Sequence, residues 1–378
     1  MSIVFYISGH GFGHASRDVE VINALGPLAP PEDHGARDAH RIVLRTAVNP
    51  GLLARTLRVP YVLIEGACDT GIIQATSITH DDAATVAAAL EFYGDYEARI
   101  TAELEVLSRE SVDLIVGDIP PLAFAVAARL GVPSVALGNF TWDWIYETHP
   151  GFLPDGARAI EIIRASYRLA TQALELPFAG GFEVFPTVQP LPLIARRPTQ
   201  SRRDTRDYFG LAQDARVALL SFGGYGLPEL DLATLDCRGT WTTVTTDRVT
   251  PTDQSALPHV RTVVERDFLS SRFRYEDLVA ACDVVITKPG FGIIAECIST
   301  GTAMLYTSRG EFREYAVLVN ALPRYVRSQF ISQRDLFAGR WRELLEALMA
   351  QPQPPEKMAV TGAEEAALVL ARLAGTRA

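Results

Sequence analysis

The chain of 378 residues is long enough for two globular domains of ordinary size, since 48% of its residues are hydrophobic and 21% are charged. Its formal net charge is -10, from 35 Lys and Arg against 45 Asp and Glu, and it contains no block of five basic residues. A nucleic-acid partner is therefore disfavoured. Four scattered cysteines without a C-x-x-C pair are typical of reduced thiols rather than of a disulfide framework or zinc site.

No apolar run is long enough to span a bilayer, and the amino terminus lacks the basic region and long apolar segment of a secretion signal. We therefore expect a cytoplasmic protein without a transmembrane segment.

The amino-terminal segment predicts a strand, a glycine-rich turn and a helix in immediate succession. Residues 3–7 are apolar, residues 8–14 read SGHGFGH, and an amphipathic stretch continues to Leu25. Glycines let the backbone bend tightly and approach a ligand, and the start of the helix presents free N–H groups. Because open α/β sheets bind ligands at the carboxyl ends of their strands, this turn provides two candidate proton-transfer groups and two ligand contacts: His10, His14, Gly11 and Gly13.

Strand-like runs alternate with helix-like stretches through the first half of the chain. Strands are expected at 40–47, 59–65, 113–117 and 132–137, and one long helix or two abutting helices at 81–109. This alternation predicts βαβ units and a parallel sheet. Asp118 follows a buried strand, where it either faces a ligand or caps the helix that opens at Pro120.

A proline-rich and then basic stretch near residue 200 predicts a domain boundary. After it the alternation restarts, with a strand at 216–222 that runs into a second glycine turn. We expect a first domain at 1–195, a linker at 196–212, a second domain at 213–360, and a terminal helix at 361–378 that could pack back on the first domain.

A third glycine turn follows the strand at 283–287 and opens a helix that carries Glu296. Glycines and a helix amino terminus suit a diphosphate, and a carboxylate one turn later suits ribose hydroxyls. Glu296 could equally be an ordinary surface carboxylate that favours the start of a helix.

Four motifs together carry a resemblance: GHGFGHA at 9–15, GDIPP at 117–121, GNFTWDWIY at 138–146, and KPGFG at 288–292 with its later glutamate. They resemble the glycosyltransferase-like amino-terminal module of plant L-arabinokinases and its free-standing bacterial relatives. More distantly, they resemble the GT-B nucleotide-sugar glycosyltransferases, including the bacterial enzyme that adds N-acetylglucosamine to lipid I. The resemblance covers nearly the whole chain. It implies an α/β GT-B fold of two Rossmann-like domains that face a central cleft.

The resemblance implies that His14 is the general base, with His10 as a second polar contact and Asp118 as the next candidate. It places the donor base at Phe268 and Leu269, the phosphates at the glycine turns, and the ribose at Glu296. The implied donor contacts are Ser221, Gly223, Gly224, Phe268, Leu269, Lys288, Pro289, Gly290, Phe291, Gly292, Glu296, Arg313 and Glu314. Where many relatives carry an Asp-Gln or Gln-Gln pair, this chain has Arg313-Glu314-Tyr315, so the donor sugar stays open.

Inverting glycosyl transfer needs a base for the acceptor hydroxyl and charge stabilisation on the departing diphosphate. The chain contains no D-x-D carboxylate pair of the kind that holds a metal ion in other glycosyltransferases. We therefore expect transfer without a metal ion or cofactor, from a nucleotide-sugar (a UDP-sugar is favoured) to a small-molecule or lipid-linked hydroxyl acceptor. Two alternatives remain open: a non-hydrolysing nucleotide-sugar epimerase, and a non-catalytic nucleotide-sugar-binding module.

Overall fold

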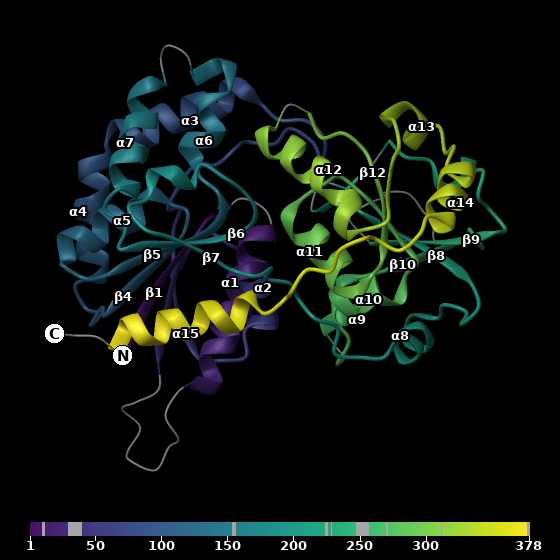
Figure 1. The fold of residues 1–378 in the computed structure, drawn as a ribbon, viewed down its shortest axis with the longest axis horizontal. Coiled ribbons are helices and arrows are strands. Elements are labelled where there is room, and N and C mark those ends of the chain that lie inside the picture. Colours follow the sequence, from purple (N-terminus) through teal and green to yellow (C-terminus); the bar gives the residue numbers. More distant parts are fainter. Residues whose placement is uncertain are drawn as a thin grey trace. The chain divides into compact units, whose positions relative to one another are not determined.

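The computed structural model describes residues 1–9, 12–28, 40–152, 156–223, 226–227, 229–246, 257–269, 271–310 and 312–375 (Figure 1). The chain divides into two compact units, each built on one parallel sheet. Unit 1 comprises Met1–Ile73, His80–Ile194 and Ala359–Ala378, and unit 2 comprises Gln74–Thr79 and Ala195–Met358. Among the described residues, no helix combines the length and apolar character needed to cross a bilayer.

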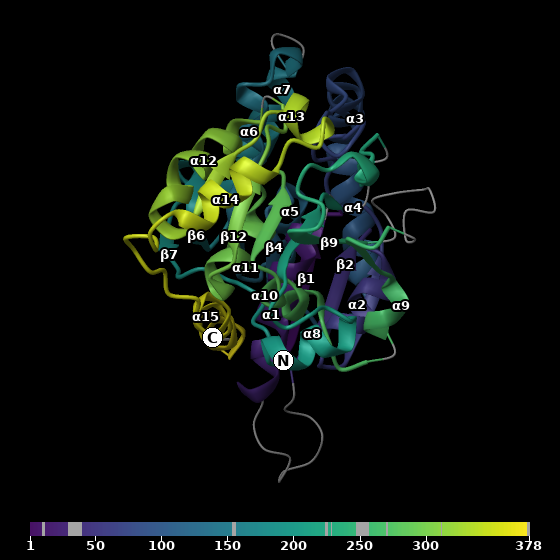
Figure 2. The ribbon, with the colours of Figure 1, turned by 90° about the vertical axis from the view of Figure 1, so that its right-hand side faces the viewer.

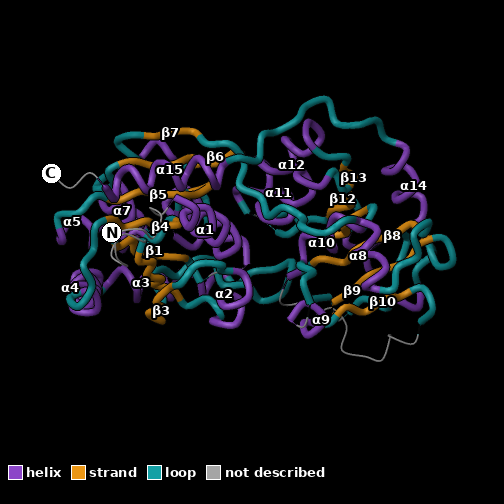
Figure 3. Tube along the Cα trace, turned by 90° about the horizontal axis from the view of Figure 1, so that it is seen from below, coloured by secondary structure: helices purple, strands orange, loops and turns teal. Residues whose placement is uncertain are grey.

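Unit 1 contains a seven-stranded sheet in the order β3-β2-β1-β4-β5-β6-β7, in which every neighbouring pair is parallel. Figure 3 shows the strands in orange and the helices in purple. Its central strands are buried and apolar, as expected of a parallel sheet covered on both faces. The strands are β1 (Ser2–Ile7), β2 (Arg41–Thr46), β3 (Tyr61–Glu65), β4 (Leu114–Asp118), β5 (Ser134–Phe140), β6 (Gln172–Gly180) and β7 (Val188–Pro190).

Helices flank this sheet, and the helical stretch expected at 81–109 forms two abutting helices, α3 and α4. The helices of unit 1 are α1 (Phe12–Leu25), α2 (Pro50–Thr56), α3 (Asp82–Gly94), α4 (Tyr96–Leu107), α5 (Pro121–Leu130), α6 (Trp142–Glu147), α7 (Ala157–Tyr167) and α15 (Gly362–Gly375). Short 3-10 turns are η1 (Gly26–Leu28), η3 (Pro150–Phe152) and η4 (Phe182–Val184).

Helix α15 is part of the core of unit 1, although it comes from the carboxyl end of the chain. It packs beside α1 (Figures 1 and 2), and Ala366 and Leu370 are fully buried in the same cluster as β1. The helix starts against the segment after β7, where the Gly362 N–H donates to the Leu193 carbonyl at 3.1 Å. A Cβ at Gly362 would lie only 2.1 Å from the Pro192 carbonyl oxygen, so this close approach requires glycine.

Unit 2 contains a six-stranded parallel sheet in the order β10-β9-β8-β11-β12-β13. Its strands are β8 (Arg216–Ser221), β9 (Trp241–Thr246), β10 (Val260–Val263), β11 (Val284–Thr287), β12 (Ala303–Tyr306) and β13 (Ser328–Phe330). Its helices are α8 (Arg202–Phe209), α9 (Glu265–Leu269), α10 (Tyr275–Ala281), α11 (Phe291–Thr300), α12 (Arg313–Tyr325), α13 (Gln333–Phe337) and α14 (Arg342–Ala350), with a 3-10 turn η6 (Leu232–Thr234).

The two units differ from the expected boundaries in two places. Residues 74–79, from within the first expected domain, belong to unit 2, because the Ser77 hydroxyl donates to the carbonyls of Phe222 at 3.0 Å and Gly226 at 2.6 Å. Residues 196–212, expected to form a linker, contain α8 and also belong to unit 2.

Helix α8 forms because its ends are capped and one of its side chains is a buried cation. Ser201 accepts a hydrogen bond from the Asp204 N–H at 3.1 Å, which caps the first turn. Arg206 is 1% exposed. Its guanidinium donates at 2.9 to 3.1 Å to Asp283 and to the carbonyls of Ala281, Ala212, Gln213 and Ala215. The sequence predicted a linker at 196–212, but this arginine ties α8 to the rest of unit 2.

We predict that Arg206→Met lowers the free energy of unfolding by about 3–5 kcal/mol, because it leaves the buried carbonyls without their donor and leaves the Asp283 carboxylate with the exposed Arg202 as its cation. Urea denaturation followed by tryptophan fluorescence measures the change. Arg203→Met is the matched control, since Arg203 is exposed on the same helix and its replacement should cost at most about 0.5 kcal/mol. Equal losses in the two variants would contradict the assignment.

Candidate functional site

The candidate site of unit 1 lies at the carboxyl ends of β1, β4 and β5, which are neighbours in the sheet. Helix α1, the next described element after β1, carries His14 and Arg17, while Asp118 ends β4 and Asn139 is near the end of β5. His10 and Gly11 lie outside the described residues. Gly13 lies in the first turn of α1, and outside its own helix backbone and chain neighbours no described residue comes within 4 Å of the place where a Cβ would lie.

A buried carboxylate organises this site. The Nδ1 atom of His14 lies 2.9 Å from one Asp118 oxygen, and the Arg17 guanidinium donates to the other oxygen. The same guanidinium also donates to the side-chain oxygen of Asn139. Asp118 is fully buried, while the His14 side chain is 11% exposed. Burial alone would raise the pKa of Asp118, but Arg17 and His14 hold it well below its ordinary value. Asp118 is therefore a carboxylate at neutral pH and orients the histidine ring.

Asp18 is a second buried carboxyl group beside Asp118. Burial and the negative charge of Asp118 raise the pKa of Asp18 well above its ordinary value. Asp18 therefore holds its proton more tightly than an ordinary aspartate, while Asp118 carries the negative charge that His14 and Arg17 stabilise. Sequence analysis missed Asp18, Arg17 and Asn139. The spacing of Arg17 from His14, three residues along one helix, was the available signal.

The backbone after Asp118 is strained. Ile119 has a φ of +59°, in the left-handed region, which is unfavourable for a buried β-branched residue. The Tyr167 hydroxyl donates to the Ile119 carbonyl at 2.8 Å and holds this conformation. Pro120 occupies the N-cap position of α5, where no side-chain capping bond forms, so the interpretation of Asp118 as a helix cap is wrong.

Aromatic side chains form a wall behind His14. Its ring lies edge-on to Phe140 at 5.7 Å between centroids and tilted against Trp142 at 6.2 Å. Asp69 fixes this wall, because its two oxygens accept hydrogen bonds from the Trp142 indole at 2.8 Å and the Ser8 hydroxyl at 3.0 Å. The ring of His14 is thus confined by packing as well as by its bond to Asp118.

The candidate site of unit 2 lies at the carboxyl ends of β8, β11 and β12. Ser221 ends β8 and is followed by Gly223, whose φ of +72° favours glycine, while Gly224 lies outside the described residues. Tyr275 connects several of the predicted residues. Its hydroxyl donates to the Ser221 hydroxyl oxygen at 2.6 Å, and its ring lies 6.5 Å from that of Phe268 on α9. Leu269 is exposed at the end of the same helix.

Lys288, one of the implied donor contacts, is half-buried after β11. Its ammonium group donates to the Ser77 carbonyl and, at 3.4 Å, to the Gln74 side chain. Burial and the nearby Arg309 cation lower the pKa of Lys288 to about 8. Arg309 also donates to the Pro289 carbonyl at 3.1 Å and lies 3.5 Å from the buried Glu314 carboxylate. Two cations therefore lie near the turn that leads to Gly290, Phe291 and Gly292, and Arg313 begins α12 next to Glu314.

Glu296 is buried in the second turn of α11, so its interpretation as a surface carboxylate at a helix start is wrong. The Nε atom of Arg196 donates to Glu296 Oε1 at 2.7 Å, and the same guanidinium lies 3.6 Å from Glu276. Glu296 Oε2 is buried and has no hydrogen-bond partner among the described residues. Burial raises the pKa of Glu296, and Arg196 opposes that rise. Sequence analysis missed Arg196, which is 100 residues from its partner.

No protein-family model matches the chain. It is 30% identical over 377 residues to the L-arabinokinase of Arabidopsis thaliana, an alignment that covers 97% of this chain and 34% of the plant protein. The chain therefore spans about a third of the length of this relative. The predicted similarity to L-arabinokinase is confirmed.

Several solved structures with the same architecture are glycosyltransferases. The kitacinnamycin glycosyltransferase superposes with a TM-score of 0.62 at 17% identity, covering 98% of both chains. SnogD from Streptomyces nogalater, with a TM-score of 0.57 and 17% identity, covers 99% of this chain and 100% of its own. The chain has the GT-B fold. Its two parallel-sheet α/β domains correspond to unit 1 and unit 2, as the motifs predicted.

We predict that Arg196→Met destabilises unit 2 more strongly as the pH rises. Without its cation, the buried Glu296 carboxyl binds its proton more tightly when folded, so stability is greatest below its unfolded pKa and falls as the pH rises toward its folded pKa. The loss should reach about 3–5 kcal/mol near pH 8 and be much smaller near pH 5 in urea denaturation. Adding Glu296→Gln should remove most of this dependence. If the loss of unfolding free energy in Arg196→Met did not depend on pH, it would arise from lost packing of the guanidinium and not from the charge of Glu296.

Proposed function

We propose that this chain is an inverting glycosyltransferase that moves a sugar from a nucleotide-sugar donor to an acceptor hydroxyl without a metal ion. The observation that carries the proposal is the His14–Asp118 pair, in which a carboxylate binds Nδ1 of a confined imidazole at the carboxyl edge of the sheet. Such a pair is suited to general-base catalysis, because the carboxylate sets the tautomer and stabilises the imidazolium that forms.

The tautomer of His14 determines how protons and electrons move in the proposed reaction. In the tautomer that we propose, the Nδ1–H of His14 donates a hydrogen bond to the Asp118 carboxylate, so Nε2 carries the lone pair that removes the proton of the acceptor hydroxyl. The acceptor oxygen then forms a bond to the anomeric carbon as the bond from that carbon to the donor diphosphate breaks. The configuration inverts, and the nucleoside diphosphate leaves with both electrons of the broken bond.

Unit 2 supplies groups suited to the donor. The amino terminus of α11 follows the turn at Gly290, and Lys288 and Arg309 add positive charge beside it. These groups can stabilise a departing diphosphate, which is the basis for proposing that no metal ion is needed there. Glu296 Oε2 remains as an acceptor for a ribose hydroxyl, and Phe268 packs against Tyr275 near the proposed base site.

Two structural neighbours support the class of donor and acceptor. VinC, with a TM-score of 0.56, is in complex with dTDP, and UGT2 of Phytolacca americana, with a TM-score of 0.58, is complexed with UDP-2-fluoro-glucose and pterostilbene. We therefore propose a nucleoside-diphosphate sugar, with uridine favoured, and a small hydroxyl acceptor.

A non-catalytic nucleotide-sugar-binding module is the second candidate. It is favoured by the similarity of this chain to about a third of a protein named for kinase activity. Such a module would bind the donor without turnover.

We predict that isothermal titration calorimetry detects binding of UDP, dTDP or their sugars, and much weaker binding of free phosphate. Glu296→Gln should weaken nucleotide binding by about 1–3 kcal/mol, because a charged hydrogen bond to ribose is lost. Glu276→Gln is the matched control, since it neutralises the other carboxylate beside Arg196. Absence of heat with every nucleoside diphosphate and nucleotide-sugar would contradict both candidate functions.

We predict that His14→Ala lowers turnover about 10² to 10⁴-fold and leaves donor affinity nearly unchanged, as expected when a positioned general base is removed. Release of nucleoside diphosphate in the presence of small hydroxyl acceptors measures turnover. His259→Ala is the control, because this histidine bonds to the Leu232 carbonyl within unit 2. Full activity in His14→Ala would place the base elsewhere. Donor binding without turnover in the unmodified protein would favour the binding module.

A further inference from the structure

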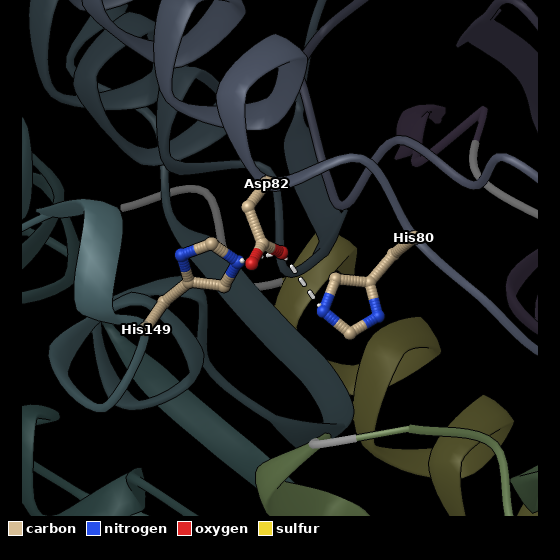
Figure 4. Close-up of side chains that lie close together, drawn as sticks. All are labelled: His80, Asp82 and His149. Atoms are coloured by element: carbon tan, nitrogen blue, oxygen red, sulfur yellow. Dashed lines mark hydrogen bonds and ion pairs between the residues drawn. The ribbon is translucent and has the colours of Figure 1, made fainter.

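Three side chains of unit 1 that have no part in the proposed reaction converge on one carboxylate. His80 precedes α3, Asp82 is the first residue of α3, and His149 follows α6. Figure 4 shows both imidazole rings pointing at the Asp82 carboxylate from opposite sides. Neither the motifs nor the proposed reaction uses these residues.

The spacing of the three side chains matches that of metal ligands. The Nε2 atoms of His80 and His149 each lie 2.9 Å from the same oxygen of Asp82, and the three candidate ligand atoms lie within 4.8 Å of one another. Ligands of a tetrahedral zinc ion, bound at about 2.0–2.1 Å, are separated by about 3.3 Å. Small rotations of the three side chains would therefore bring all of them to bonding distance from one ion.

The surrounding structure holds two of the ligands in place. The Asp81 side chain accepts from the Ala84 N–H at 2.9 Å and so fixes the first turn of α3, where Asp82 lies. The His149 ring is buried and packs edge-on to Phe152 at 5.6 Å between centroids. The side chain of Asp82 is 57% exposed, which leaves access for an ion and room for water as a further ligand.

We propose that His80, Asp82 and His149 bind a divalent transition-metal ion of the zinc class. Two imidazole nitrogens and one carboxylate oxygen suit zinc, whereas magnesium and calcium prefer oxygen ligands. The ion would cross-link α3 to the segment after α6, which are 67 residues apart in the sequence. The ion would also restrain the backbone at His80, where the chain re-enters unit 1 directly after the segment Gln74–Thr79. The role is structural and separate from transfer.

A purely hydrogen-bonded cluster is the competing explanation, since both imidazoles can donate Nε2–H to the carboxylate. The two explanations differ in what happens when the ion is offered. A metal site binds one ion per chain and competes with protons on the imidazoles, whereas a hydrogen-bonded cluster takes up no ion with defined stoichiometry.

The test uses the full chain without a histidine tag, treated with a chelator and then titrated with zinc chloride by calorimetry. Cobalt(II) provides a second readout, because a four-coordinate site produces intense visible absorption. We expect one ion per chain, a rise in melting temperature on addition of zinc, and affinity at least about 100-fold weaker in His149→Ala and in Asp82→Asn. His80→Ala provides a further variant at the less buried ring if His149→Ala fails to fold.

Asp81→Asn is the matched control. It makes the same change of charge one residue earlier, and an asparagine retains the helix cap, so zinc affinity should be unchanged. No stoichiometric zinc binding by the unmodified chain would overturn the proposal. Unchanged affinity in His80→Ala and Asp82→Asn would also overturn it, because the ion would then bind elsewhere.

Discussion

Both units depend on one constraint: a parallel sheet covered on both faces admits polar side chains chiefly at the ends of its strands. Charges placed there are largely removed from water, and a buried charge is tolerated only with a partner. In unit 1 the buried Asp118 carboxylate is paired with Arg17 and His14. In unit 2 the buried Glu296 carboxylate is paired with Arg196. Loss of the partner charge at either candidate site therefore leaves a buried carboxylate without a cation, which destabilises the unit that holds it.

The same constraint explains how unit 1 sets the state of its histidine. Asp18 and Asp118 are buried side by side, so ionising both would place two negative charges close together out of water. The cation of Arg17 favours the charge on Asp118. The strained backbone of Ile119, tied to Tyr167, then fixes where that carboxylate lies. Charge, strain and aromatic packing thus act on one imidazole ring.

Much of the fold could be predicted from the sequence, because its signals are local. Apolar runs ending in glycine turns marked β1, β8 and β11, and their alternation with helices predicted parallel sheets and, through the motifs, the GT-B fold. The assignment of segments to the two units was harder to predict from the sequence. Residues 74–79 join unit 2 through the hydrogen bonds of Ser77, and α8 joins it through the buried Arg206, neither of which has a periodic signature.

The sequence by itself determined which residue types stand after which strands: histidines after β1, an aspartate at the end of β4, and a glycine turn with a glutamate after β11. Only the tertiary structure decided their partners. His14 and Asp118 are 104 residues apart, Arg196 and Glu296 are 100 apart, and Asp82 and His149 are 67 apart. These pairs meet because of strand order and helix packing. Both arise from long-range burial of apolar surface, which hydrophobic periodicity within a short window does not specify.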